Sequence, residues 1–456
     1  MAAEASTEGS GGAVVGRVVH QKGRGIAGEP KETDFDVGPV TVEALGAGEV
    51  RVVTEWVSVD PCQKVGMRTP WSTTEVAGGP NTGACVGRVV ASACDRVRVG
   101  SVVRGRWGWR DVANVRGGDV EELAELAAAR PSAALGVLGM PGRAAYFGLF
   151  KILKPARGQT LFVSGGAGCV GSCVAQMAKA HFGCVVYGST IHASKVDWME
   201  SVGYEKGGVL DGYYADGPEH YAAALKKMIP QGVDLYLDCV GGELSEGVWR
   251  LLNDGARVAV CGQMAYACER RATLAGLGAL YPTYGAIAGL WNLATKTRAS
   301  LYNLKIAEVV NVRCLKAAAA AAAAPGAVVA APETVALPDG KTATYEAYAE
   351  ARFFAEAHEA EAFIADMIDR GDLKYQEDVE IGDLDVIPGQ FCKLFHGSNH
   401  GKALVKIDAK AGAEIKAKRA ADRAERVRQR EAEDEEARRL EAAEKAEAMA
   451  EAKAAS

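Results

Sequence analysis

The sequence predicts an α/β fold in which a β-rich region is followed by a doubly wound parallel sheet and then by a charged helical tail. Three observations predict it. From Val14 to about Leu138, short apolar runs alternate with polar residues and glycines, as in antiparallel strands joined by turns. From Pro141 to about Arg313, strand-like runs alternate with helical patterns, which predicts parallel strands joined by crossover helices. Residues 409–456 are almost entirely Ala, Glu, Lys and Arg.

The length and composition limit the class of protein. A chain of 456 residues can hold two compact domains and further segments. Its 48% apolar and 24% charged residues are ordinary for a globular protein, and a net charge of −6 argues against nucleic-acid binding. The eleven cysteines include no CxxC pair, which favours reduced thiols and a cytoplasmic location. Residues 1–12 lack the apolar core of a targeting signal.

The most informative stretch lies at residues 161–195. An apolar run at 161–163 precedes the motif Gly166-x-Gly168-x-x-Gly171, and a helical pattern runs from about residue 169 to 180. Strand, glycine turn and helix in this order predict a dinucleotide site. The glycines allow a pyrophosphate to approach the backbone, and the helix N-terminus offers it unpaired N–H groups.

The end of the second strand indicates which nucleotide binds. NAD sites usually place a carboxylate there to bind the ribose 2′-hydroxyl, but residues 188–192 contain none. A carboxylate would repel a 2′-phosphate, whereas Lys195 can pair with one. The alternative for Lys195 is a solvated lysine on a helix surface. The sequence therefore predicts NADPH rather than NADH as the cofactor.

Five strands are expected in the parallel sheet, near residues 161–164, 184–188, 233–238, 256–261 and 304–313. The alanine run at 317–324 and the Pro/Ala/Val stretch after it lack the large apolar residues of a core. A low-complexity surface insertion is therefore expected at 314–348. A helix at about 349–370 follows, and then strands and one short helix up to Ile407.

Two segments have alternative interpretations. Residues 272–294 carry no charge and are long enough to span a bilayer, but Pro282 and several glycines favour a buried lid or a subunit contact over membrane insertion. The tail at 409–456 has balanced charges and lacks heptad apolar positions, so a solvated single helix is favoured over a coiled coil. The tail is either an arm that binds a protein partner or a dispensable extension.

Several short motifs occur together in one order along the chain. Besides the glycine turn and Lys195, they are Ser58-Val-Asp-Pro61, Gly139-Met-Pro-Gly142, Ala145-Tyr-Phe-Gly148, Leu237-Asp-Cys-Val-Gly-Gly-Glu243, Val260-Cys-Gly262, Gly371-Asp-Leu-Lys-Tyr375 and Ser398-Asn-His-Gly-Lys402. In this set the chain resembles the zinc-independent medium-chain dehydrogenase/reductases, and among them the branch of prostaglandin reductases and NADP-dependent 2-alkenal reductases. The resemblance covers roughly residues 14–313 and 350–407.

The resemblance implies a Rossmann-type cofactor domain inserted in a GroES-like catalytic domain, and a homodimer formed through the cofactor domain. The expected segments are the first part of the catalytic domain at 14–140, the cofactor domain at 141–313, the insertion at 314–348, the last cofactor-domain helix at 349–373, the return of the catalytic domain at 374–408 and the tail at 409–456.

The resemblance also implies cofactor contacts, position by position. The pyrophosphate would lie at the glycine turn, and the 2′-phosphate would meet Lys195. The residues at which these and the other cofactor contacts are expected are Gly166, Ala167, Gly168, Cys169, Val170, Gly171, Lys195, Tyr213, Tyr214, Cys239, Cys261, Gly262, Val309, Val310, Asn311 and Asn399.

The chain departs from the family at several of these motifs. Cys62, Cys239 and Ala144 stand where the family has tyrosine, asparagine and threonine. The family tyrosine that is linked to product protonation comes one residue later than Tyr266, which is the catalytic candidate here; the alternative is an ordinary packed tyrosine. Tyr146 either shapes the substrate pocket or belongs to the core.

The reaction implied by the resemblance is the NADPH-dependent reduction of the C=C bond of an α,β-unsaturated carbonyl, such as an alkenal, an enone or a prostaglandin-like substrate. Hydride adds to the β-carbon, the enolate oxygen needs a hydrogen-bond donor, and the α-carbon takes a proton from a tyrosine or water. The alternatives are a quinone oxidoreductase of the same superfamily and a non-catalytic, nucleotide-bound scaffold.

No metal is expected. The sequence has no Gly-His-Glu segment and no four-cysteine loop, which a zinc alcohol dehydrogenase would need. Cys169 and Cys173, four residues apart on the predicted helix, are expected to be small core residues rather than metal ligands.

Overall fold

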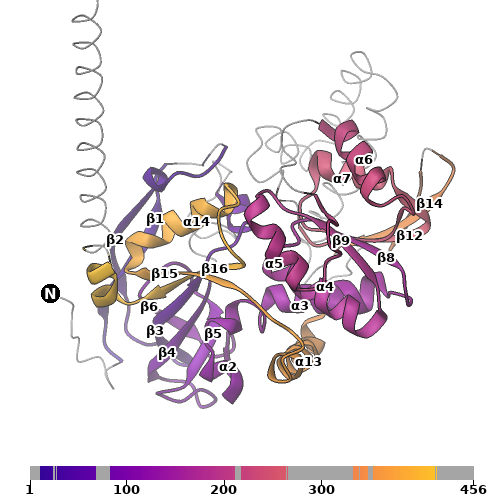
Figure 1. Cartoon of the computed structure of the whole chain (residues 1–456). Helices are drawn as coiled ribbons and strands as arrows, with labels where there is room; N and C mark the ends of the chain where they lie inside the picture. Colours follow the sequence, from indigo (N-terminus) through magenta and orange to yellow (C-terminus); the bar gives the residue numbers. More distant parts are fainter. Residues whose placement is uncertain are drawn as a thin grey trace, which may run out of the picture.

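The computed structural model describes residues 11–23, 26, 28–67, 83–210, 217–262, 264, 332–337, 339–347, 353–415 and 417. These residues form two lobes, each built around its own main sheet (Figure 1). We call them the β-rich lobe, whose strands lie within residues 14–122 and 377–407, and the parallel-sheet lobe, whose strands lie within residues 160–347. The predicted α/β class is confirmed.

The β-rich lobe contains one antiparallel pair of strands and one larger, mixed sheet. Its strands are β1 (Val14–Gln21), β2 (Phe35–Val42), β3 (Glu49–Ser58), β4 (Ala84–Ser92), β5 (Val102–Arg106), β6 (Val112–Arg116), β7 (Val120–Glu122), β15 (Glu377–Gly382) and β16 (Lys402–Ile407). Its helical segments are η1 (Glu32–Asp34), α1 (Gln63–Gly66), α2 (Glu125–Ala129), η3 (Ala133–Leu135), η9 (Leu384–Val386) and α14 (Ile387–Phe395). The pair is β1–β2, and the larger sheet has the order β15-β16-β3-β4-β5-β7, with β6 also paired to β3.

Residues 377–407 complete this lobe. Strand β16 runs antiparallel to β3, with Leu404 opposite Ser58, and β15 runs parallel to β16. Helix α14 places Phe391 in the core, where its ring centroid lies 5.2 Å from that of Trp109. The chain therefore leaves this lobe and returns to it, as the resemblance implies.

The parallel-sheet lobe has the order β10-β9-β8-β11-β12-β14-β13, in which all neighbours are parallel except β13 and β14. Its strands are β8 (Thr160–Val163), β9 (Val185–Ser189), β10 (Val209–Leu210), β11 (Val233–Asp238), β12 (Leu252–Val260), β13 (Glu333–Ala336) and β14 (Thr342–Ala347). Its helical segments are α3 (Met140–Phe147), η4 (Gly148–Leu153), α4 (Cys169–Phe182), η5 (Ala193–Lys195), α5 (Val196–Ser201), α6 (Gly217–Met228), α7 (Gly242–Trp249), η8 (Phe354–Glu356) and α13 (Ala357–Asp369).

Both faces of this sheet are covered, which explains its nearly continuous apolar strands. Leu161 and Val163 of β8 belong to a core with residues of α3, α4 and α13, whereas Phe162 belongs to a second core with residues of α6 and α7. Because successive side chains of a strand point to opposite faces, all four residues of β8 are buried. The predicted doubly wound arrangement is therefore confirmed.

The structure differs from the expectation for part of the predicted surface insertion. Residues 333–336 and 342–347 pair as the antiparallel strands β13 and β14, and β14 extends the sheet beside β12. Alternate residues of β14, Ala343 and Tyr345, are buried, so this stretch contributes to the core although its composition is poor in large apolar residues. The alanine run at 317–324 and the strand expected at 304–313 lie outside the described residues.

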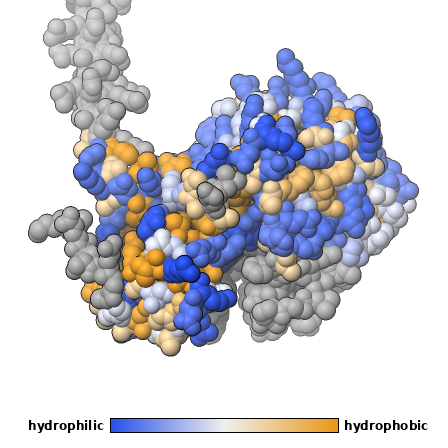
Figure 2. Space-filling model, turned by 90° about the horizontal axis from the view of Figure 1, so that it is seen from below, coloured by the Kyte–Doolittle hydropathy of each residue, from blue (hydrophilic) through white to orange (hydrophobic). Residues whose placement is uncertain are grey.

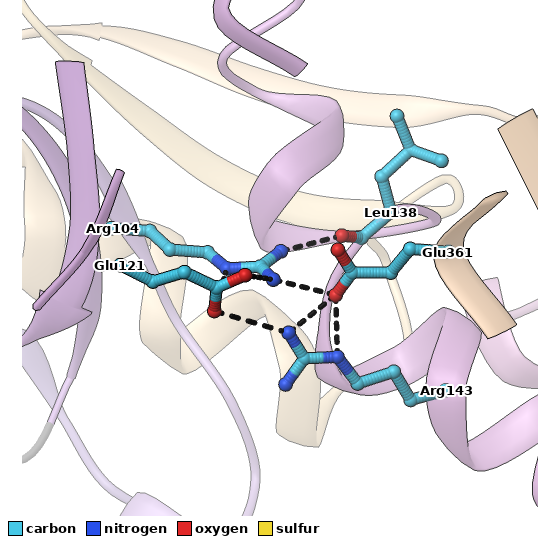
Figure 3. A network of polar contacts seen from close by, with 5 residues as sticks. All are labelled: Arg104, Glu121, Leu138, Arg143 and Glu361. Atoms are coloured by element: carbon cyan, nitrogen blue, oxygen red, sulfur yellow. Dashed lines mark hydrogen bonds and ion pairs between the residues drawn. The ribbon is translucent and has the colours of Figure 1, made fainter. Parts of the chain in front are cut away.

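A network of ion pairs around two buried arginines joins the two lobes (Figure 3). Arg104 on β5 and Arg143 on α3 have side chains that are only 9% and 7% exposed. Nη2 of Arg104 lies 2.6 Å from carboxylate oxygens of both Glu121 on β7 and Glu361 on α13. Nε of Arg143 donates to the same Glu361 oxygen at 2.5 Å, and Nη1 of Arg104 donates to the Leu138 carbonyl at 2.7 Å. Buried guanidinium groups require such partners, so this network fixes how the lobes meet.

The two lobes differ in the surface they present in Figure 2, where hydrophobic residues gather over the β-rich lobe and the visible face of the parallel-sheet lobe is mostly hydrophilic. Val15 and Val99 of the β-rich lobe are exposed large hydrophobic residues. Among the described residues, no helix is both long and apolar enough to cross a membrane. Residues 272–294, for which membrane insertion was the disfavoured alternative, are not among them.

Candidate functional site

The glycine turn connects β8 to α4 at the carboxyl end of the parallel sheet. Helix α4 begins at Cys169, directly after Gly168. A Cβ atom on Gly171 would lie 2.6 Å from the Gly166 Cα and 2.9 Å from the Gly165 carbonyl oxygen, so the last glycine packs the helix onto the turn. A Cβ atom on Gly168 would meet only that carbonyl oxygen, at 3.3 Å. The middle glycine therefore leaves one face of the turn open, as a closely approaching pyrophosphate requires.

The amides that open α4 are suited to bind an anion. Ser172 donates the first intrahelical hydrogen bond, from its backbone N–H to the Gly168 carbonyl at 2.9 Å. The amides of Cys169, Val170 and Gly171 come before it, in the first turn of the helix, where backbone N–H groups have no intrahelical acceptor. Together with the helix dipole, they favour a negatively charged group at this end of α4.

A buried tyrosine outside the sequence motifs supports the turn. Tyr204 follows α5, is 2% exposed, and has its hydroxyl 3.0 Å from the Gly171 carbonyl and 3.2 Å from the Gly166 carbonyl. A Cβ atom on Gly166 would lie 2.5 Å from that hydroxyl, and one on Gly188 would lie 2.5 Å from the same ring. Burial raises the pKa of Tyr204 well above its ordinary value, so the hydroxyl stays a proton donor. These contacts give the first glycine a packing role.

Asp238, at the end of β11, holds the neighbouring loops together. Its Oδ1 accepts hydrogen bonds from the Ser164 hydroxyl at 3.0 Å and from the amides of Val240 and Gly241 at 3.0 and 2.8 Å. Its Oδ2 accepts one from the Ser245 hydroxyl at 2.6 Å. The side chain is 1% exposed. A fully bonded, buried carboxylate fixes the loops after β8 and β11, which carry the glycine turn and Cys239.

The predicted contacts after β11 and β12 come together at this edge. The backbone carbonyl of Asp238 accepts hydrogen bonds from the amides of Cys261 and Gly262, at 2.7 and 3.0 Å. A Cβ atom on Gly262 would lie 2.8 Å from the Cys239 carbonyl oxygen, so glycine is needed for this close approach. Cys239 also lies beside the glycine turn, because a Cβ atom on Gly165 would be 3.7 Å from its Cβ. Burial raises the pKa of both thiols, that of Cys261 to about 12.

Lys195 is buried, so the alternative of a solvated surface lysine is wrong. It is the last residue of η5, directly before α5, is 8% exposed, and its Nζ donates a hydrogen bond to the Gly397 carbonyl at 2.5 Å. Burial lowers the pKa of its ammonium group, and the nearby charge of Asp378 opposes that shift. Gly397 belongs to the loop between α14 and β16, so the lysine reaches across from the parallel-sheet lobe to the β-rich lobe. Asn399 lies in the same loop, where its Nδ2 donates to the Gly401 carbonyl at 2.8 Å.

The other candidates have separate outcomes. Tyr213, Tyr214, Tyr266, Val309, Val310 and Asn311 lie outside the described residues, so their roles stay predictions. The core interpretation of Tyr146 is confirmed. It is 7% exposed, its ring lies 4.7 Å from that of Phe150 and 5.2 Å from that of Phe363, and its hydroxyl donates to Glu359 at 3.1 Å.

The departures from the family motifs occupy different environments. Cys62 is exposed, whereas Ala144 is buried in α3.

Cys173 is fully buried in α4, and the hydrogen bond with Cys169, together with burial, raises the pKa of its thiol well above the ordinary value. Over the residues that the structure describes, no group of three or more His, Cys, Asp and Glu side chains could hold a metal ion.

Comparison with known proteins gives matches over both lobes. Residues 12–123 match the family model described as the N-terminal domain of oxidoreductase, and residues 169–291 match the one described as zinc-binding dehydrogenase. The NADP-dependent 2-alkenal reductase of Nicotiana tabacum is 32% identical over 246 residues, which are 53% of this chain and 70% of that enzyme. The chain belongs to the medium-chain dehydrogenase/reductase family. The motifs described above place it among the zinc-independent members.

Two further matches agree with this family. The NADPH-dependent curcumin reductase of Escherichia coli (strain K12) is 36% identical over 238 residues, which are 52% of this chain and 67% of that enzyme. The crystal structure of CurA from Vibrio vulnificus in complex with NADPH has a TM-score of 0.64 at 24% identity, and the match covers 86% of this chain and 99% of that one. This medium-chain dehydrogenase/reductase therefore has the two-domain fold that its motifs imply.

Proposed function

We propose that this protein uses NADPH to reduce the carbon–carbon double bond of α,β-unsaturated carbonyl compounds. The observation that carries the choice of NADPH is the pairing of an open glycine turn before α4 with a buried lysine after β9, where residues 188–192 contain no carboxylate. NADP-dependent alkenal and curcumin reductases among the relatives support the same cofactor and reaction class.

The residues present fit an NADPH molecule along this edge. Strands β9 and β11 lie on either side of β8, so the crevice outside β8 and β11 is a switch point of the doubly wound sheet. The first amides of α4 would hold the pyrophosphate, and Lys195, which uses one of its three N–H donors on Gly397, would hold the 2′-phosphate with the others. Cys239, Cys261 and Gly262 would then lie beside the nicotinamide half.

The chain contributes orientation and a neutral surrounding to the reaction. When bound, NADPH supplies the hydride. The thiols of Cys239 and Cys261 stay protonated near neutral pH, since burial raises their pKa, and they line the edge without charge. A protonated thiol is also a poor nucleophile toward an electrophilic enone. Tyr266 remains the candidate that donates to the enolate oxygen or protonates the α-carbon.

Turnover with a panel of acceptors tests this proposal. Oxidation of NADPH is followed at 340 nm with the purified protein and alkenals, enones and quinones. We expect turnover with alkenals and enones. Turnover with quinones alone would assign the protein to the quinone oxidoreductases, and tight NADPH binding without turnover on any acceptor would identify a scaffold.

Three further features of the proposal concern the protein's surroundings. A homodimer through the parallel-sheet lobe follows from the family, and the charged tail at 409–456 is either an arm that binds a protein partner or a dispensable extension. A cytoplasmic location is supported by the nine cysteines among the described residues that are free thiols.

A further inference from the structure

Two loops from different lobes meet at the expected 2′-phosphate position. The loop after β9 supplies His192 and Lys195, and the loop between α14 and β16 supplies their acceptors. Nε2 of His192 donates to the His396 carbonyl at 2.9 Å, and Nζ of Lys195 donates to the Gly397 carbonyl at 2.5 Å. These are contacts of side chains with consecutive backbone carbonyls, so their geometry depends on the backbone of the second loop.

The backbone at Gly397 is specified by two independent constraints. Its φ angle of +62° lies in the left-handed region, which residues with a side chain rarely adopt. A Cβ atom at this position would also lie 2.7 Å from the Cδ1 of Ile191, in the facing loop. Glycine satisfies both constraints as the loops stand, whereas a residue with a side chain would be strained at this φ angle and would require the Ile191 side chain to move.

The loop is anchored on its own side as well. The amides of Gly397 and Ser398 donate to the Leu394 and Lys393 carbonyls at the end of α14, at 3.2 and 3.1 Å. Helix α14 is itself fixed by Phe391, which is fully buried in the aromatic core of the β-rich lobe. The Gly397 carbonyl is thus a rigid acceptor, and it removes the rotational freedom of a long, flexible lysine side chain before any ligand binds.

The charge around the lysine fits an anion subsite. Asp378 is the acidic group whose charge acts on Lys195. Its own carboxylate is occupied, because Oδ2 accepts from the His400 amide at 3.1 Å and Oδ1 accepts from Nε2 of Gln390 at 3.0 Å. Lys393 also lies 3.6 Å from it. Asp378 is thereby held by several donors, and the ammonium of Lys195 keeps donors for a phosphate.

We propose that Gly397 is a positioning residue for NADPH recognition, whose carbonyl holds the Lys195 ammonium where the 2′-phosphate binds. The inference rests on the proposed function and extends it, because it makes the choice between NADPH and NADH depend on a residue in the lobe that does not carry the glycine turn. Cofactor choice then requires that the two lobes be in contact at this loop.

Binding of nucleotide fragments tests the proposal without turnover. Isothermal titration calorimetry measures the Kd of adenosine 2′,5′-bisphosphate and of 5′-AMP for the full-length protein and for Gly397→Ala. We expect the Kd of the 2′,5′-bisphosphate to rise about tenfold, which corresponds to about 1.4 kcal/mol, while that of 5′-AMP stays within about twofold. The matched control is Gly158→Ala, because Gly158 has a φ of +79° and no atom within 4 Å of its Cβ position. It should leave the ratio of the two Kd values unchanged.

A second variant decides the matter if Gly397→Ala does not fold. His192→Ala removes the neighbouring contact from an exposed side chain, and we expect it to raise the Kd of the 2′,5′-bisphosphate about threefold, with 5′-AMP again unaffected. If Gly397→Ala folds, an unchanged ratio of the two Kd values, or tighter binding of the 2′,5′-bisphosphate, would overturn the proposal. If only His192→Ala folds, an unchanged ratio of the two Kd values in that variant would overturn it. Failure of the wild-type protein to bind the 2′,5′-bisphosphate would instead contradict the proposed function.

Discussion

Replacing Glu361 by glutamine should weaken the contact between the two lobes. One oxygen of this carboxylate accepts hydrogen bonds from Arg104 and from both Nε and Nη2 of Arg143 (Figure 3). Removing one partner of a fully buried ion pair costs about 3–5 kcal/mol. Glu361 is 21% exposed, however, and Glu121 still bonds both arginines. We therefore expect the unfolding free energy to fall by about 2 kcal/mol, which is typical of a hydrogen bond to a charged group.

Thermal unfolding measures this loss against a matched control on the same helix. For a chain of 456 residues, an unfolding entropy of about 2.1 cal/mol/K per residue gives a shift of about 1 °C per kcal/mol, so the Glu361→Gln protein should unfold about 2 °C below the wild type. The control is Asp366→Asn, since Asp366 pairs with Arg370 at i,i+4 with both side chains more than half exposed. That pair contributes at most about 0.5 kcal/mol, so the control should shift the Tm by about 1 °C or less. Equal Tm values for the two variants would show that this network does not stabilise the contact between the two lobes.

Two further predictions concern the same contact between the lobes and the glycine turn. Burial alone would raise the pKa of Glu121, but hydrogen bonds and charge from Arg104 and Arg143 lower it overall. The ionised carboxylate therefore stabilises the folded protein at any pH above the pKa of Glu121 in the unfolded chain. This stabilisation is lost as the pH falls through the lower pKa of the folded state. The Tm difference between wild type and Glu121→Gln should therefore shrink in acid, and a constant difference from pH 7 to pH 3 would contradict this. Tyr204→Phe should raise the Kd of NADPH about threefold, because the turn loses its hydroxyl contact. The control Tyr187→Phe, whose hydroxyl is 3.4 Å from Gln231 at the surface, should not change that Kd, and an equal effect of both variants would remove Tyr204 from the site.

The sequence predicted those parts of the fold that depend on local pattern. The strand expected at 233–238 coincides with β11, and the glycine turn lies between a strand and a helix as its motif requires. The strands β13 and β14 were not predicted, because the buried Ala343 and Tyr345 stand in a stretch whose composition is typical of loops. Only one of these two positions, Tyr345, holds a large apolar residue, so the apolar pattern of the strand is too weak to stand out from its surroundings.

The candidate site was predictable where a backbone motif specifies it and not where distant residues complete it. The glycines at 166, 168 and 171 are recognisable because the turn itself demands them. The burial of Lys195 depends on a carbonyl about 200 positions later in the chain, at Gly397, and no local pattern reports that contact. Asp238 stood inside a recognised motif, but its role as the acceptor of four hydrogen bonds appears only when its neighbouring loops are placed in space. Tyr204, which lies after α5, belongs to no motif that the sequence made recognisable.

The reductase assignment depends on one binding event, in which the turn at α4 and Lys195 together bind the phosphorylated nicotinamide cofactor. Calorimetric Kd values of NADPH and NADH for the wild type and for Lys195→Ala test this claim. The wild type should bind NADPH more tightly than NADH, and Lys195→Ala should weaken NADPH binding about ten- to a hundredfold and leave NADH nearly unchanged, since a charge-assisted hydrogen bond contributes about 1.5–3 kcal/mol. A wild-type protein that binds neither nucleotide, or a Lys195→Ala protein that keeps the full preference for NADPH, would contradict the claim.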